Sequence, residues 1–207
     1  MFSSSQHPSF QRPGLHLRWR WGVIRAWILR PWILVRAAMS GTRCEIGARL
    51  SLQGRLRVRG PGRVIIEDDV IIGDGADLYT HHPDAVIRIG RGTFLNGTRI
   101  SSALEVTIGA ENIIGDARLL DTDFHWSHRD RHQDSRPVPA MAIRTGRNVW
   151  IGAATVLLKG SEVGENSVIA MGAIVSGRVP ADEIWGPERA RFLAKVAEPP
   201  KHSESPS

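Results

Sequence analysis

Aliphatic side chains recur at every sixth position through most of this chain. A six-residue period fits neither an α-helix nor an isolated strand, but it fits a chain wound into flat coils of short parallel strands. Small residues stand two positions before the aliphatic ones, and in a strand these two side chains point to the same side. The clearest run is Ile151, Leu157, Val163, Ile169 and Val175. The pattern predicts a β-solenoid of about six coils, stacked at the ~4.7 Å spacing of paired strands.

The same period begins earlier in the chain and sets the extent of the repeat domain. It runs first through Ile46, Leu52, Val58, Val64 and Val70. It returns in Phe94, Ile100, Val106 and in Ile108, Ile114, Leu120. These repeats predict one all-β solenoid domain over residues 41–183. Periodicity alone does not reveal the handedness of the coil.

One long insertion interrupts the repeats, and we expect it to form an extended loop over residues 121–142. Loops of this length inside a regular domain are usually functional or disordered. The loop carries three histidines and four aspartates, His125, His128, His132, Asp121, Asp123, Asp130 and Asp134. Imidazole can act as a general base near neutral pH, and it can also bind zinc. The plain alternative is a solvated polar loop.

Tryptophan and arginine alternate near the N-terminus. Residues 1–14 are expected to form a disordered lead, and residues 15–40 an amphipathic helical segment. The longest uncharged stretch of residues 15–40 is far short of the ~20 apolar residues that a membrane span needs. Arginines interrupt the segment throughout, so it lacks the apolar core of a signal peptide. Two interpretations stay open: a helix that caps the open end of the solenoid, or a segment in the headgroup region of an anionic membrane. No nucleic-acid partner is predicted.

The cysteine content indicates a cellular compartment, and the pattern at the C-terminus indicates one more helix. The chain has 207 residues, a formal net charge of +6 and a single cysteine, Cys44. A lone cysteine forms no internal disulfide, which favours the reducing cytoplasm, with a peripheral position at the inner face of the membrane if the N-terminal segment binds lipid. An apolar stripe predicts a short C-terminal helix over 184–196. Residues 197–207 are expected to form a disordered tail.

Two motifs in a fixed order resemble a known family. They are Asp-Phe-His-Trp-Ser-His at 123–128 and Gly-Arg-Asn-Val-Trp-Ile-Gly at 146–152, followed by closing repeats. This arrangement resembles the hexapeptide-repeat acyltransferases and, among them, is similar to sugar O-acetyltransferases of the maltose and galactoside acetyltransferase type. The resemblance covers about residues 46–195. It implies a left-handed parallel β-helix, a homotrimer with active sites between neighbouring subunits, and acetyl-CoA as co-substrate.

The resemblance also implies roles for individual residues. His125 matches the family's catalytic base, and the backbone amide of Ala153 matches the one that steadies the oxyanion. Residues expected to hold the acceptor sugar are Asn96, Asp123 and His128. Residues expected near the CoA are Trp150, Ala153, Met171, Arg178 and Arg189. Ser101 and Ser102 depart from the family, whose galactoside acetyltransferase-like members tend to carry acidic residues there.

Plainer interpretations stand beside these roles. Asn96 at a coil corner could simply tolerate left-handed backbone, and Trp150 could be a surface packing residue. No role is predicted for His81 or His82. The function expected from the resemblance is transfer of an acetyl group from acetyl-CoA to a hydroxyl of a carbohydrate, with no metal required.

Three other functions remain open. One is an N-acetyltransferase acting on an amino sugar or antibiotic, and another is a zinc enzyme similar to γ-class carbonic anhydrase. The third is a non-catalytic trimeric scaffold.

Overall fold

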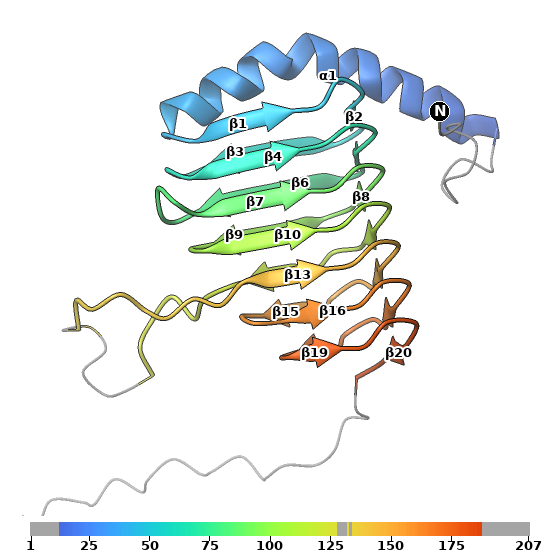
Figure 1. Ribbon diagram of the computed structural model, residues 1–207. Helices are drawn as coiled ribbons and strands as arrows, with labels where there is room; N and C mark the ends of the chain where they lie inside the picture. Colours follow the sequence, from blue (N-terminus) through green and yellow to red (C-terminus); the bar gives the residue numbers. More distant parts are fainter. Residues whose placement is uncertain (1–12, 128–131, 133, 188–207) are drawn as a thin grey trace, which may run out of the picture.

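The chain winds into a left-handed parallel β-helix capped by one long helix (Figure 1). The computed structural model describes residues 13–127, 132 and 134–187. Helix α1 (Pro13–Met39) comes first, and twenty strands follow it in three parallel sheets. The predicted fold class is therefore confirmed.

Each turn of the solenoid contributes one strand to each of three sheets, here named A, B and C. Sheet A contains β1 (Arg43–Ile46), β4 (Arg63–Ile66), β7 (Val86–Ile89), β10 (Glu105–Ile108), β13 (Ile143–Thr145), β16 (Glu162–Val163) and β19 (Arg178–Val179). Sheet B contains β2 (Ser51–Leu52), β5 (Ile71–Ile72), β8 (Phe94–Leu95), β11 (Ile113–Ile114), β14 (Trp150–Ile151), β17 (Val168–Ile169) and β20 (Ile184–Trp185). Sheet C contains β3 (Arg55–Arg59), β6 (Gly75–Thr80), β9 (Thr98–Ser102), β12 (Arg118–Leu120), β15 (Val156–Leu158) and β18 (Ile174–Val175).

The C-terminal end differs from the prediction. Sheets A and B have seven strands each, one more than the six coils expected. The segment at 184, predicted to begin a helix, instead forms β20, which pairs with β17 in parallel. Backbone pairing with an existing strand needs no inward aliphatic side chain, and both residues of β20 are exposed, so the sequence period does not show this strand. Residues 188–207, including most of the predicted helix and the predicted tail, lie outside the described residues, as do residues 1–12 of the predicted lead.

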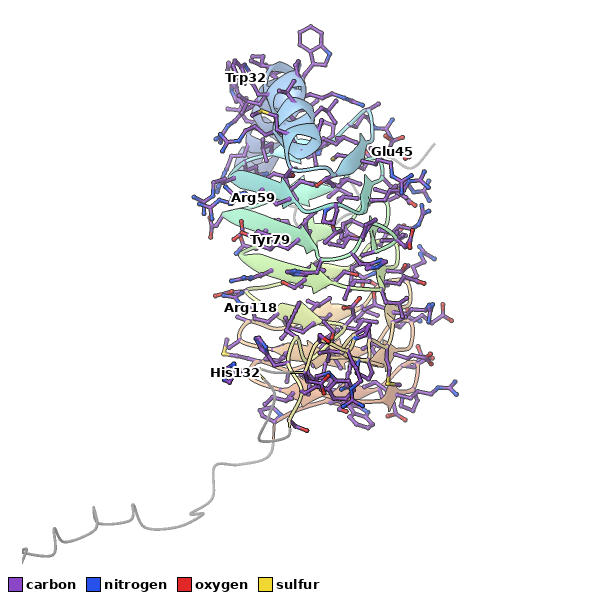
Figure 2. All side chains as sticks on the ribbon, turned by 90° about the vertical axis from the view of Figure 1, so that its left-hand side faces the viewer. Trp32, Glu45, Arg59, Tyr79, Arg118 and His132 are labelled. Carbon is purple, nitrogen blue, oxygen red and sulfur yellow. The ribbon has the colours of Figure 1, made fainter. Side chains whose placement is uncertain are left out.

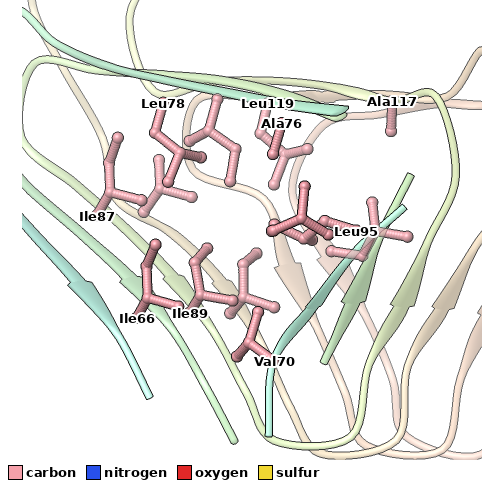
Figure 3. Packing of buried hydrophobic residues seen from close by; sticks show 14 of the residues in the cluster. Ile66, Val70, Ala76, Leu78, Ile87, Ile89, Leu95, Ala117 and Leu119 are labelled. Atoms are coloured by element: carbon pink, nitrogen blue, oxygen red, sulfur yellow. The ribbon is translucent and has the colours of Figure 1, made fainter. Parts of the chain in front are cut away.

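The aliphatic residues of the repeat fill the solenoid interior (Figure 3). Leu78, Ile87, Ile89 and Leu95 have no exposed surface, and corresponding residues of successive coils lie directly above one another. The small residues also point inward as the period predicts, since Thr155, Ser161 and Ser167 are fully buried. Their hydroxyls donate to backbone carbonyls, for example that of Ser167 to the Pro180 carbonyl at 2.7 Å. The buried hydroxyl groups of these three residues are thus all hydrogen-bonded.

Helix α1 lies across the first coil and covers that end of the core (Figure 1). Gly22 makes the closest approach: a Cβ there would lie 2.2 Å from the Ser51 hydroxyl. That hydroxyl donates to the Trp19 carbonyl at 3.1 Å, and the Arg25 guanidinium donates to the Gln53 carbonyl at 2.7 Å. Ala26 and Ala37 are buried beneath the helix. These contacts realise the capping alternative, because the helix shields an open sheet end that would otherwise be exposed.

Cys44 on β1 gives a testable consequence of this packing. Burial, with a further contribution from Glu45, raises the pKa of its thiol from 9.0 to about 11. We expect iodoacetamide to alkylate folded protein about 100-fold more slowly than urea-unfolded protein at mildly alkaline pH, since only the thiolate reacts. The protonated thiol favours folding; this contribution is complete below the unfolded pKa and is lost as the pH rises toward 11. Equal alkylation rates in the two states would contradict the burial.

Candidate active site

The histidine loop leaves the solenoid between β12 and β13 and is closed at its base. Thr122 and Ala140 form an antiparallel bridge, and the Met141 N–H donates to the Asp121 carbonyl at 2.9 Å. The Thr122 hydroxyl donates to the Pro139 carbonyl at 3.4 Å. The loop therefore projects from a fixed hairpin-like stem, which limits how far its first residues can move.

Asp121 begins the loop and is fully buried. Its Oδ1 accepts from the Ala103 N–H at 2.7 Å, and its Oδ2 accepts from the N–H groups of Leu104 and Glu105 at 2.9 Å. Oδ2 also accepts from the Ser102 hydroxyl at 2.7 Å. Four donors thus surround one carboxylate and join the loop to the corner between β9 and β10. Ser102, which departs from the family pattern, is itself buried and directed at Asp121.

His125 lies four residues into the loop and is exposed. The preceding residue, Phe124, has a left-handed backbone with φ 62°, and its N–H donates to the Thr122 hydroxyl at 3.4 Å. This turn presents the imidazole of His125 to solvent on a stem held by Asp121. His128, predicted to help hold the acceptor, lies outside the described residues.

His81 is a residue of this site that sequence reasoning missed. Its ring meets the Phe124 ring edge to face, with the centroids 4.7 Å apart. Burial lowers the pKa of His81; nearby Asp121 opposes the shift, whereas Arg99 adds to it. The signal lies in the strand register, because β6, β9 and β12 are neighbours in sheet C and the chain leaves all three at one edge. The contact between His81 and Phe124 can be predicted only when the strands of successive coils are aligned, and not from the local sequence.

Asp123 is paired with a residue that the sequence analysis did not select. Its carboxylate forms an ion pair with the Lys159 ammonium, which comes directly after β15. The pair ties the loop to the next coil at the edge where sheet C turns into sheet A. The Asp123 carboxylate is therefore already paired with the Lys159 ammonium group, and its contact with an acceptor sugar remains a prediction.

Three of the other predicted residues line a different corner, where sheet B turns into sheet C. Ala153 and Met171 lie at corresponding places, two residues after β14 and β17, whereas Asn96 directly follows β8, one residue earlier in its turn. The Asn96 side chain accepts from the Asp74 N–H at 2.7 Å, which joins neighbouring coils. The left-handed backbone at this corner belongs to Gly97, with φ 73°, and not to Asn96. Asn96 thus has a structural contact, but not the backbone role considered above.

The backbone amide of Ala153 is open. Among the described residues none accepts a hydrogen bond from the Ala153 N–H. On the neighbouring coil stands Gly115, where a Cβ would lie only 3.0 Å from the Ala153 nitrogen, so a glycine there keeps this side uncrowded. Trp150, on β14 just before, is 54% exposed and Met171 is 67% exposed. An unpaired N–H between exposed apolar side chains suits a ligand carbonyl oxygen.

The structure separates His125 from this corner within one chain. Asp123 is paired with Lys159 at the end of β15, whereas Ala153 precedes the same strand. The intervening extended chain puts the two edges about 15 Å apart. Figure 1 shows the loop and the small strands of sheet B on opposite sides of the solenoid. Within the described part of a single subunit, His125 therefore does not reach the open amide.

The two arginines predicted to contact the CoA phosphates, Arg178 and Arg189, are not among the described residues at the Ala153 corner. Arg178 is exposed on β19 of sheet A, away from the column that holds Ala153. Arg189 lies outside the described residues. The described residues contain no group of three His, Cys, Asp or Glu side chains arranged to hold a metal ion.

Comparisons with known proteins find acetyltransferases that are similar to this chain. It is 30% identical over 117 residues to the galactoside O-acetyltransferase of Escherichia coli K12, covering 56% of this chain and 57% of that protein. It is 24% identical over 149 residues to WbbJ of E. coli K12, described as a putative lipopolysaccharide biosynthesis O-acetyl transferase, covering 68% and 65%. The chain thus spans less than two thirds of these relatives. No family model matches it.

Two solved structures share the fold over most of both chains. A galactoside acetyltransferase in complex with coenzyme A matches with a TM-score of 0.50 and 22% identity, covering 90% of this chain and 84% of that one. A hexapeptide-repeat acetyltransferase of Vibrio cholerae complexed with acetyl coenzyme A matches with a TM-score of 0.50 and 18% identity, covering 91% and 92%. The fold is that of the hexapeptide-repeat acetyltransferases. The resemblance predicted from the sequence is confirmed.

Proposed function

We propose that this protein transfers an acetyl group from acetyl-CoA to a hydroxyl of a carbohydrate, at sites between neighbouring subunits of a homotrimer. The observation that carries the proposal is the separation of His125 from the open amide of Ala153. Each subunit offers half of an acyl-transfer site at each of two edges. A second subunit can bring its Ala153 corner to the first subunit's histidine loop, and repeating this contact around a threefold axis closes a ring.

The proposed chemistry needs only groups that these edges supply. The neutral imidazole of His125 takes the proton from the acceptor hydroxyl as its oxygen attacks the thioester carbonyl carbon. The negative charge that develops on the carbonyl oxygen is stabilised by the Ala153 N–H. When the tetrahedral intermediate collapses, the carbon–sulfur bond breaks and the imidazolium returns its proton to the departing thiolate. The products are an acetyl ester and free CoA.

The remaining predicted residues receive supporting roles in this proposal. Trp150 and Met171 flank the open amide and suit the apolar part of the pantetheine arm. Arg178 and Arg189 are proposed to contact CoA phosphates, since guanidinium binds phosphate oxygens in a two-pronged geometry. Asn96, Asp123 and His128 are proposed to hold the acceptor. The lone Cys44 supports a cytoplasmic reaction.

The choice of a sugar hydroxyl over an amine rests on the relatives. Both sequence relatives described above are O-acetyltransferases by name. The test measures free thiol released from acetyl-CoA against a panel of sugars, amino sugars and an aminoglycoside. We expect turnover with sugars that lack an amine, together with a trimer mass by sedimentation. Turnover confined to amines would show that the acceptor is an amine and not a hydroxyl. An absence of acetyl-CoA binding by calorimetry would refute the proposed acetyltransferase activity.

A further inference from the structure

The positive charge of this protein is concentrated at the helix-capped end. Residues 13–63 contain eleven arginines and one acid, Glu45. The rest of the chain has 16 Lys and Arg against 20 Asp and Glu, so its formal charge is negative. Residues 13–63 form α1, the first coil and the start of β4, which lie together at one end of the solenoid (Figure 1). Such an asymmetry favours an anionic partner at that end.

Helix α1, expected to be amphipathic, has two apolar faces. The inner face carries Gly22, Ala26, Leu29, Ile33 and Ala37, which pack on the first coil. The outer face carries seven large side chains at intervals of three or four residues: Leu17, Trp21, Ile24, Ile28, Trp32, Val35 and Met39. Their spacing places them in one stripe along the side opposite the solenoid. All seven are between 49% and 83% exposed.

This outer stripe is too large to be an ordinary surface feature. It extends over about 33 Å of helix, and soluble monomers rarely expose a contiguous apolar patch of that size. Arg18 and Arg36 border it on one side and Arg20 on the other, and none of them takes part in an ion pair within the described residues. Figure 2 shows Trp32 at the outer end of the molecule, far from the histidine loop. The stripe therefore faces a partner that no other part of the described chain supplies.

A shallow hollow lies beside the stripe. It has a volume of about 270 Å³ and is bounded by α1 and the first coil, with Arg18, Trp21 and Arg25 in its wall. Two guanidinium groups next to an indole suit a phosphate that is attached to an apolar chain. The hollow thus joins cationic and apolar contacts at one place.

We propose that the outer face of α1 binds the surface of an anionic phospholipid bilayer. Indole rings favour the membrane interface, and arginines next to them can contact lipid phosphates. A second copy of this chain suits the stripe poorly, because each helix carries five arginines and no acid, so two such faces would repel one another. Among the described helices none is long and apolar enough to cross a membrane. The helix is accordingly placed on the surface of the bilayer.

This contact would orient the whole molecule. Since α1 lies across the end of the solenoid, the coils would extend away from the bilayer. The histidine loop joins β13, four strand spacings or about 19 Å beyond β1. That height suits a glycan chain extending from the surface, a consequence that rests on the proposed acetyl transfer. The membrane contact itself does not depend on it.

The test is flotation of the full chain with vesicles of phosphatidylcholine, with and without phosphatidylglycerol. We expect binding only to the anionic vesicles, and we expect added salt to weaken it. The triple variant Trp21→Ser, Ile28→Ser, Trp32→Ser should lower the ratio of vesicle-bound to free protein at least about tenfold. Arg18→Gln, Arg20→Gln, Arg36→Gln together should lower it about 100-fold. Trp185→Ser, an exposed tryptophan at the opposite end, should bind like wild type.

Three outcomes would overturn the proposal. These are equal binding to neutral vesicles, unchanged binding of both triple variants, and a concentration-dependent doubling of mass that the stripe variant abolishes. The last would assign the stripe to a second copy of the chain. Thermal unfolding of each variant separates loss of binding from loss of fold, since the changed residues lie outside the inner face. Acetyl-CoA turnover of the stripe variant on a soluble sugar should stay at the wild-type level, so the two proposals fail separately.

Discussion

Replacing His125 with alanine is expected to lower acetyl transfer by about 10²- to 10⁴-fold, the usual loss when a general base is removed. The measurement is free thiol release from acetyl-CoA with the best acceptor of the panel. His125 is exposed and so contributes little packing, and its thermal unfolding should match that of wild type. His132→Ala, an exposed histidine of the same loop, serves as the control and should retain activity within about twofold. Equal turnover by the wild type and His125→Ala would show that another group is the base.

Mixing two inactive variants tests whether the site lies between subunits. Ala153→Pro removes the open N–H, and proline suits this position because it is the first central residue of a turn whose second, Ala154, has φ 57°. His125→Ala and Ala153→Pro should each be inactive alone. Reassembled together, they should regain a fraction of wild-type turnover at contacts that combine an intact histidine with an intact amide. A mixture that stays inactive, although mixed oligomers form, would place both groups in one subunit.

The second large effect is expected on stability. Asp121→Ala removes a fully buried carboxylate that accepts from three backbone N–H groups and from the buried Ser102 hydroxyl. Leaving such donors unpaired costs roughly 1–3 kcal/mol each before relaxation, so we expect a loss of about 4 kcal/mol in the free energy of unfolding. Urea denaturation measures it.

Two further variants sharpen this prediction. Asp123→Ala, two residues away, removes only an exposed ion pair with Lys159 and should change the free energy of unfolding by less than about 1 kcal/mol. Asp121→Asn should fall between the two, because its amide NH₂ must face an N–H donor at one of the carboxylate positions. A midpoint for Asp121→Ala equal to that of Asp123→Ala would show that the buried carboxylate does not hold the corner.

The solenoid could be predicted because its determinants are local. Where the period is clearest, three six-residue sides separate paired positions such as Val156 and Ile174, and each strand pairs only with the strands directly above and below. Buried residues such as Leu157 and Val175 therefore appear in the sequence at regular intervals. The loop at 121–142 could be located for the same reason, since an insertion is visible against a strict period.

The composition of the candidate site was only partly predictable. His125 stood out within an interrupted repeat, but His81 is 44 positions earlier and meets Phe124 only because three strands of sheet C end at one edge. The pairing of Asp123 with Lys159 likewise depends on how the loop folds back. Contacts between coils follow from the closure of each turn, which residue spacing does not reveal.

The sequence by itself determined the repeat, the place of the loop and the presence of a tryptophan- and arginine-rich segment at one end. Only the tertiary structure decided three further matters: that α1 packs one apolar face inward and turns another outward, that β20 replaces the start of a helix, and that His125 and Ala153 lie at opposite edges of sheet C. The physical reason is the same in each case. Side-chain period reports which residues share a face, whereas the partner of that face is set by how separate elements come together in space.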